Sequence, residues 1–305
     1  MRDAFVKQLT ELAKKDESIF FITADLGFGV FDNFAERFPN QYLNVGVAEQ
    51  NMVGIATGLG LEGRKVFTYS IANFATLRCL EQIRNDAAYH EVNLTVVASG
   101  GGFTYGGLGM SHHATEDISI MRSLPGVEVV APCTAWETYE ATKLLSQNQG
   151  VSYLRIEKGG IQIPPYPNTE FEVGKAIKMI EGSDISIIAT GGIITECLKA
   201  EKILKDQGVS SEVISMHTIK PLDEDAIIAS ASLTKNIITV EEHNKYGGLG
   251  SAVAETIAKY NIDCRLSCIS IDDVYSAIVG SQEYLRAHYK LDHHEIIKKA
   301  QALLQ

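Results

Sequence analysis

A single carboxylic acid, Glu49, stands where a short apolar segment gives way to a predicted helix rich in small residues. The run reads LNVGVAEQNM from Leu43 to Met52 and continues as VGIATGLG, whose small side chains would allow close packing. A carboxyl group at such a strand-to-helix junction is poorly solvated and can share its proton with a basic ring nitrogen. An acid in the first turn of a helix also complements the helix dipole. The pattern alone leaves both a catalytic acid and a helix cap open.

Apolar runs typical of strands alternate with helical periods along the chain, which is the pattern of a parallel α/β sheet. An amphipathic helix is expected at the start of the chain, before the first strand. The expected strands cover residues 19–23, 65–69, 94–98, 127–130 and 152–156, then 185–190, 211–216 and 237–241, with a helix over 195–207. This alternation predicts an α/β protein.

The segment Ile163-Pro164-Pro165-Tyr166-Pro167-Asn168 interrupts the pattern. Its three prolines remove backbone donors and are compatible with neither a helix nor a central strand. A chain of 305 residues is long enough for two domains of ordinary size. We therefore expect domains at residues 1–165 and 166–305, each a mainly parallel sheet flanked by helices.

The segment NVGVAEQNMVGIATGLGLEG, residues 44–63, resembles the signature of the pyrimidine-binding domain of the transketolase family, whose members use thiamine diphosphate. The segments TVEEHNKYGGLGSAVAE and YSAIVGSQEYLRAHYKL resemble the C-terminal domain of that family. Together they correspond to the second half of a full-length transketolase. In the family, the Glu that matches Glu49 hydrogen-bonds the aminopyrimidine ring of the cofactor and activates its thiazolium carbon. The resemblance implies a catalytic role for Glu49.

Three further residues match positions that the family uses around the cofactor. Phe74 matches the aromatic residue that stacks on the aminopyrimidine, although a core position would also suit a Phe. Asp25 matches an acidic residue near the cofactor at the subunit interface, and a turn or cap is its alternative. His112 follows a Gly-rich loop and matches a catalytic histidine that faces the thiazolium carbon and the substrate oxygens. His113 stands where the family usually has Gln, and we assign it no role.

Two basic residues fall where transketolases bind the phosphate of a sugar phosphate. Arg2 matches a phosphate-binding Arg, and Lys158 replaces a second one. A Lys supplies a point charge where an Arg would form two hydrogen bonds, so geometric selection weakens while attraction remains. The resemblance therefore predicts a substrate with a terminal anion, while a solvated surface position is the alternative for each residue.

The substrate-binding positions also show departures from the family. Gly100, Leu108 and Gly29 stand where a transketolase has His, Asp and Ser, whose side chains hydrogen-bond the carbonyl and hydroxyl groups of the ketose donor. A buried hydroxyl without its partner costs about 1 to 3 kcal/mol. These departures favour a donor or acceptor with fewer hydroxyls near the reacting carbon, such as a deoxy sugar, a branched-sugar precursor or a 2-oxo acid, with Leu108 as an apolar contact.

The first half of a transketolase is missing from this sequence, including the Gly-Asp-Gly run and downstream Asn that hold Mg²⁺ and the cofactor diphosphate. The resemblance therefore implies a diphosphate-binding partner subunit that carries the metal ligands, in an α2β2 heterotetramer with homodimeric contacts of this chain. The activity implied is transfer of a two-carbon ketol or related acyl unit. A β subunit of a 2-oxo acid dehydrogenase, a deoxyxylulose phosphate synthase-like enzyme and a non-catalytic assembly subunit remain alternatives.

Composition narrows the range of partners. The formal net charge of −11 argues against nucleic acid and anionic membranes, since both favour a basic surface. No apolar segment suits a signal peptide or a membrane span. The five cysteines are odd in number and scattered, which suits a reducing compartment. We expect a cytoplasmic enzyme acting on a small sugar.

Overall fold

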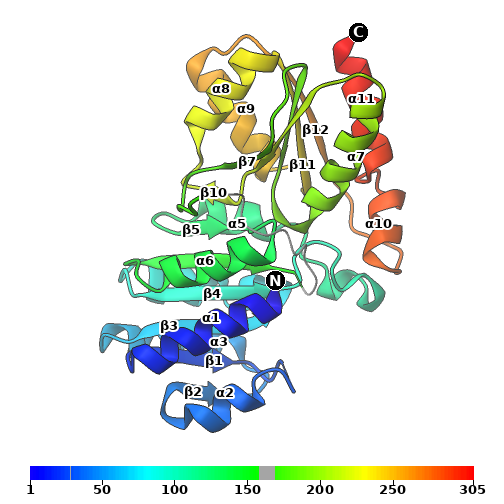
Figure 1. Ribbon diagram of the computed structural model, residues 1–305. Helices are drawn as coiled ribbons and strands as arrows, with labels where there is room; N and C mark the ends of the chain where they lie inside the picture. The colour runs from blue at the N-terminus through cyan, green and yellow to red at the C-terminus, as the bar shows by residue number, and fades with distance from the viewer. Residues whose placement is uncertain (28, 158–168) are drawn as a thin grey trace.

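The structure, a computed structural model, describes residues 1–27, 29–157 and 169–305, which form two sheets with helices on both faces (Figure 1). The expected domain boundary in the proline-rich segment and Lys158 both lie outside the described residues. The two mainly parallel sheets confirm the predicted fold class.

The first sheet has seven strands in the order β10-β5-β6-β4-β3-β1-β2. These are β1 (Ile19–Thr23), β2 (Tyr42–Asn44), β3 (Lys65–Ile71), β4 (Leu94–Ser99), β5 (Glu128–Val130), β6 (Val151–Ile156) and β10 (Thr218–Lys220). All neighbours are parallel except β5 and β10. The carboxyl ends of β1, β3, β4 and β6 therefore meet at one edge, where ligands of open α/β sheets usually bind.

The second sheet has five strands in the order β12-β11-β8-β9-β7. These are β7 (Ile177–Ile180), β8 (Ile185–Ala189), β9 (Ser211–Ser215), β11 (Asn236–Asn244) and β12 (Arg265–Ile271). Only the β7–β9 pair is antiparallel. In Figure 1, α7 and α11 cover one side of this sheet, and α8 and α9 cover the other.

The helices and short turns join these strands. The α-helices are α1 (Arg2–Lys15), α2 (Asp32–Arg37), α3 (Glu49–Leu61), α4 (Ala72–Leu77), α5 (Asp117–Ser123), α6 (Ala135–Leu145), α7 (Ile194–Asp206), α8 (Glu224–Thr234), α9 (Leu249–Tyr260), α10 (Gln282–His288) and α11 (His293–Leu304). The short 3-10 turns are η1 (Pro39–Gln41), η3 (Gly106–Leu108), η4 (Met110–His112) and η5 (Gly191–Ile193), and η2 (Gln82–Ala88) is a π-helix. Helix α1 is amphipathic as expected, and it packs beside α6 on one face of the first sheet (Figure 1).

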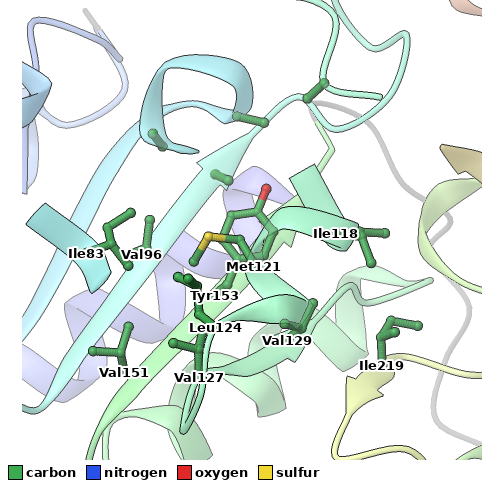
Figure 2. Packing of buried hydrophobic residues seen from close by; sticks show 14 of the residues in the cluster. Ile83, Val96, Ile118, Met121, Leu124, Val127, Val129, Val151, Tyr153 and Ile219 are labelled. Atoms are coloured by element: carbon green, nitrogen blue, oxygen red, sulfur yellow. The ribbon is translucent and has the colours of Figure 1, made fainter. Parts of the chain in front are cut away.

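The core on the other face of the first sheet continues into the second half of the chain. One cluster of buried apolar residues includes Val96 and Tyr153 of the first sheet together with Ile219 of β10. Figure 2 shows Ile219 beyond Ile118 and Val129 in this cluster. Strand β10 thus closes the edge of the first sheet with residues from the second half of the chain, which the sequence patterns did not predict.

The small residues of α3 differ in what they contact. A Cβ added at Gly60 would lie 2.9 Å from the Cβ of Val92, so this glycine allows close packing as expected. At Gly54 and Gly58 nothing lies within 4 Å, and both are exposed. The expectation of close packing is therefore wrong for these two glycines within the described chain.

Among the described residues, no helix combines the length and apolar character needed to cross a membrane.

Candidate active site

Glu49 begins helix α3 and is buried, with 4 % of its surface exposed. Nη1 of Arg78 donates hydrogen bonds to both carboxylate oxygens, at 3.0 and 3.1 Å. The Ser70 hydroxyl donates to Oε1 at 3.4 Å. The cap residue of α3 is Ala48, which makes no side-chain cap bond. The carboxylate is therefore directed at groups from β3 and the end of α4 as well as lying in the first turn of its own helix.

Arg78 lies between Glu49 and Phe74. Its guanidinium carbon is 3.6 Å from the centre of the Phe74 ring, so the cation covers one face of that ring. Phe74 is only half-buried. Arg78 was not predicted from the sequence, although its spacing of four residues from Phe74 along a helix is the spacing at which side chains meet.

His112 also contacts Phe74. The two ring centres are 5.1 Å apart and the planes are inclined at 62°. The imidazole Nδ1 is 3.0 Å from the Ser111 hydroxyl, and the Ser111 carbonyl accepts a hydrogen bond of 2.8 Å from Nδ2 of Asn73. The structure thus brings Glu49, Phe74 and His112 together in one row, with Arg78 as an unpredicted fourth member.

The loop that carries His112 is closed on itself. Gly102 and Ala114 form a two-residue antiparallel bridge, with N–H···O distances of 2.8 and 3.0 Å. Inside the bridge, His113 is buried, with Nε2 3.3 Å from the Gly106 carbonyl. Burial lowers the pKa of His113, and the Gly106 contact only partly opposes that shift. His113 is therefore suited to support the loop as a neutral side chain.

Three consecutive residues at the end of β11 hold this loop from the second domain. The Glu242 carboxylate accepts the backbone N–H of Phe103. Nε2 of His243 accepts the backbone N–H of Ser119 at 3.2 Å. The backbone N–H of Asn244 donates to the Thr115 carbonyl at 2.7 Å. The second domain therefore fixes both sides of the His112 loop.

A buried ion pair between Arg155 and Asp117 also supports the His112 loop. Arg155 Nε lies 2.8 Å from Asp117 Oδ2, and both side chains are at most 2 % exposed. Arg155 Nη2 donates to the carbonyls of Ala114 at 3.1 Å and Glu242 at 2.9 Å. Burial acts to lower the pKa of Arg155, but Asp117 and the nearby acidic groups raise it on balance. The guanidinium therefore stays charged and joins the loop to both domains.

Asp25 and Arg2 lie at the same sheet edge but outside the row of Glu49, Phe74 and His112. Asp25 is exposed, has a left-handed backbone (φ 52°), and is held by Asn44, whose Oδ1 accepts its N–H at 3.0 Å. Arg2 is 28 % exposed, and its Nε lies 3.2 Å from Asp3. In the described part of the chain, no hydrogen bond or ion pair joins either residue to that row.

The departure from the family at Gly100 has a structural basis. Its φ is +85°, and a Cβ there would lie 2.1 Å from Cε2 of Tyr105. The Tyr105 hydroxyl is 3.4 Å from the Ser99 hydroxyl. The Tyr105 ring thus takes the space of a side chain at position 100, so a His there would require Tyr105 to move. Sequence reasoning missed Tyr105 because the positive φ and the close ring are visible only in the fold.

The other two departures from the family, Gly29 and Leu108, lie at open positions. Gly29 has φ +74°, a Cβ added there would meet nothing within 4 Å, and its N–H donates to Asp32 Oδ1 at 3.2 Å. Leu108 lies in η3 and is 58 % exposed, so within this chain it does not line an enclosed apolar pocket. A cavity of about 310 Å³ lies beside the His112 loop, bordered by Asn73, Leu77 and residues of the second domain.

Replacement of Gly100 by Ala should lower the free energy of unfolding by about 2 to 4 kcal/mol, because the positive φ and the Tyr105 ring both penalise a Cβ. Gly29→Ala is the matched control: its φ is also positive, but no atom lies nearby, so about 1 kcal/mol is expected. Chemical denaturation of both variants checks this. Equal losses would show that Tyr105 moves aside without cost.

The described residues form neither a three-residue metal cluster nor a disulfide. Within residues 1–27, 29–157 and 169–305, no group of three His, Cys, Asp or Glu side chains is arranged to hold a metal ion. All five cysteines are free thiols.

Residues 1–162 match the family model for the transketolase pyrimidine binding domain, and residues 174–296 match that for the transketolase C-terminal domain. The chain therefore belongs to the transketolase family, as the sequence resemblance predicted.

Particular relatives match almost the whole chain. A protein of Methanocaldococcus jannaschii described as a transketolase C-terminal section is 41 % identical, with 98 % of this chain and 94 % of the relative covered. One of the subunits of the apulose-4-phosphate transketolase of Phocaeicola vulgatus is 37 % identical, with 98 % and 96 % covered. A solved split-gene transketolase, described as an inactive β4 tetramer, is 33 % identical with a TM-score of 0.91, covering 99 % of this chain and 97 % of that chain. The relatives thus include subunits of split transketolases.

Proposed function

We propose that this chain is the pyrimidine-binding subunit of a split transketolase-like transferase that uses thiamine diphosphate. The observation that carries the proposal is the arrangement of Glu49 and Phe74 on either side of the Arg78 guanidinium. This flat group has its central carbon 3.6 Å from the centre of the Phe74 ring and donates hydrogen bonds to the Glu49 carboxylate at 3.0 and 3.1 Å. An aminopyrimidine is also flat, and its ring nitrogen can share a proton with a carboxyl group. The residues present therefore fit the pyrimidine half of the cofactor.

Glu49, Phe74 and His112 have different roles around the pyrimidine ring. When bound, thiamine diphosphate supplies a nucleophilic carbon and an electron sink for cleavage next to a carbonyl group. Glu49 shares a proton with a nitrogen of the pyrimidine ring. Its burial keeps water from hydrogen-bonding to the carboxyl group in place of the ring. Phe74 fixes the plane of the ring. His112, beside Phe74, donates hydrogen bonds to substrate oxygens and exchanges protons with them.

The diphosphate half of the cofactor needs a second chain. The sequence holds no Gly-Asp-Gly run, so we assign the diphosphate site and the Mg²⁺ ligands to a partner subunit in an α2β2 assembly. The structure of a relative as an inactive β4 tetramer supports self-association of such chains and the need for a partner. We retain residues 1–165 as the pyrimidine domain, residues 166–305 as the C-terminal domain, and a cytoplasmic location.

The proposed substrate is a sugar or related carbonyl compound with a terminal anion and few hydroxyls near the reacting carbon. Arg2 and Lys158 supply positive charge, and a relative is named for a sugar 4-phosphate. Gly100 presents no hydrogen-bonding side chain, and the Tyr105 ring occupies the space where one would lie. Each hydroxyl left without a partner costs about 1 to 3 kcal/mol. Leu108 reaches an apolar part of the substrate only once the partner covers it.

The test is to purify this chain with the product of its neighbouring gene, as the candidate diphosphate-binding subunit, and to titrate thiamine diphosphate and Mg²⁺ by calorimetry. Tight binding by the mixture, and weak binding by each chain alone, is expected. The loaded complex is then assayed with xylulose 5-phosphate, deoxy donors and 2-oxo acids. Failure of every combination to bind the cofactor would favour a non-catalytic assembly subunit. Ordinary transketolase efficiency on xylulose 5-phosphate would overturn the proposed substrate class.

A further inference from the structure

The position of Arg78 bears on how the cofactor enters. Its guanidinium is planar, lies 3.6 Å from the Phe74 ring centre, and donates to both oxygens of Glu49. These are the ring face and the acceptor atoms that the proposed function assigns to the aminopyrimidine. A guanidinium and a pyrimidine cannot stack on the same face of Phe74 and bond to the same carboxylate at once.

We propose that Arg78 is a placeholder in the pyrimidine site, and that the cofactor ring displaces its guanidinium from Glu49 and Phe74. This inference rests on the proposed function. It adds a residue of this chain that controls how tightly and how fast the cofactor binds.

The charges of the site explain why a placeholder is useful. The Glu49 side chain is 5 % exposed, and an uncompensated buried carboxylate is costly. Arg78 supplies the missing positive charge and covers the apolar face of Phe74 from water. When the pyrimidine arrives, its ring nitrogen and the Glu49 carboxylate share a proton taken from solvent, which neutralises the buried charge, and its flat surface covers Phe74. It therefore replaces both contributions of the guanidinium.

The Arg78 side chain can move into a solvent-exposed hollow when it leaves Glu49. Its side chain is 44 % exposed, in contrast to that of Glu49. It borders an open hollow at the surface that is also lined by Gln50, Glu81 and Arg84. Glu81 is exposed and lies three residues further along the chain, so it can receive the guanidinium in water. Departure of Arg78 therefore requires rotation of one side chain and no rearrangement of the core.

The test measures thiamine diphosphate binding to the complex with the diphosphate-binding subunit, in the presence of Mg²⁺. Arg78→Ala should lower the Kd on the order of tenfold, because about 1.5 kcal/mol of charge-assisted hydrogen bonding no longer opposes the cofactor. Arg84→Ala is the matched control, since Arg84 borders the same hollow and, among the described residues, its side chain hydrogen-bonds to Asn85 and not to Glu49. It should leave the Kd unchanged.

Binding kinetics give a second measurement that does not depend on the stability of the Ala variant. In the wild-type complex, the observed rate of cofactor binding should reach a plateau as cofactor concentration rises, because Arg78 must first leave. Arg78→Lys keeps the charge but not the planar contacts. It should fold normally and raise that plateau.

The outcomes separate the two proposals. If the wild-type complex binds no thiamine diphosphate, both the proposed function and this inference are wrong. If the wild type binds it and Arg78→Ala binds equally tightly with an unchanged rate profile, Arg78 is no placeholder while the proposed function stands. If Arg78→Ala binds more weakly, Arg78 is also no placeholder, and it is a direct contact of the bound cofactor.

Discussion

Replacement of Glu49 by Gln should reduce kcat of the assembled enzyme by about 10² to 10⁴, the usual contribution of a positioned acid or base. Gln has nearly the same shape and can still fill the buried site at the start of α3. It cannot hold a negative charge or a transferable proton opposite a ring nitrogen. Arg78 would lose its charged partner, but its side chain is 44 % exposed and can turn into water. The fold should therefore survive while turnover does not.

The measurement is steady-state turnover of the complex, together with size-exclusion chromatography to show that assembly is retained. Glu62→Gln is the control, because Glu62 lies at the other end of the same helix and is exposed. It should keep full activity. A Glu49→Gln complex with near-wild-type kcat would remove Glu49 from the mechanism and favour its role as a helix-capping acid.

The buried strands could be predicted from the sequence because their apolar runs are long and bounded by turn residues. The expected strand at 19–23 coincides with β1, and the one at 65–69 falls within β3. Strands β7 and β10 were missed because they have four and three residues, which is too short for a clear period. β10 also joins a sheet built from the other half of the chain, which local patterns cannot show.

The candidate site was predictable only where a motif carries it. The resemblance identified Glu49, Phe74 and His112, and the fold places these three together. Arg78 was missed because its contact with Glu49 spans 29 positions along the chain. An Arg at the end of a helix looks like an ordinary solvated residue in the sequence. Tyr105 was missed for a similar reason, because its ring covers Gly100 only once the loop has closed.

The largest expected loss of stability comes from the ion pair beneath the His112 loop. Asp117→Asn would leave Arg155 charged, buried and without its nearest counter-ion. Removal of one partner of a buried pair costs about 3 to 5 kcal/mol. Arg155 also donates to the carbonyls of Ala114 and Glu242, so the loss should loosen the loop and its attachment to the second domain.

Two measurements on Asp117→Asn check this expectation: the free energy of unfolding in denaturant, and hydrogen exchange of residues 102–119. Glu255→Gln is the matched control, because Glu255 also pairs with an Arg across the two domains, at 3.1 Å from Arg122 Nη1, but is 63 % exposed. An exposed pair contributes about 0 to 1 kcal/mol, so this variant should change little. If Asp117→Asn lowered the free energy of unfolding no more than Glu255→Gln does, then Glu242 and Glu157 would suffice as counter-ions for Arg155. Faster exchange confined to the loop would instead show that the ion pair holds His112 beside Phe74.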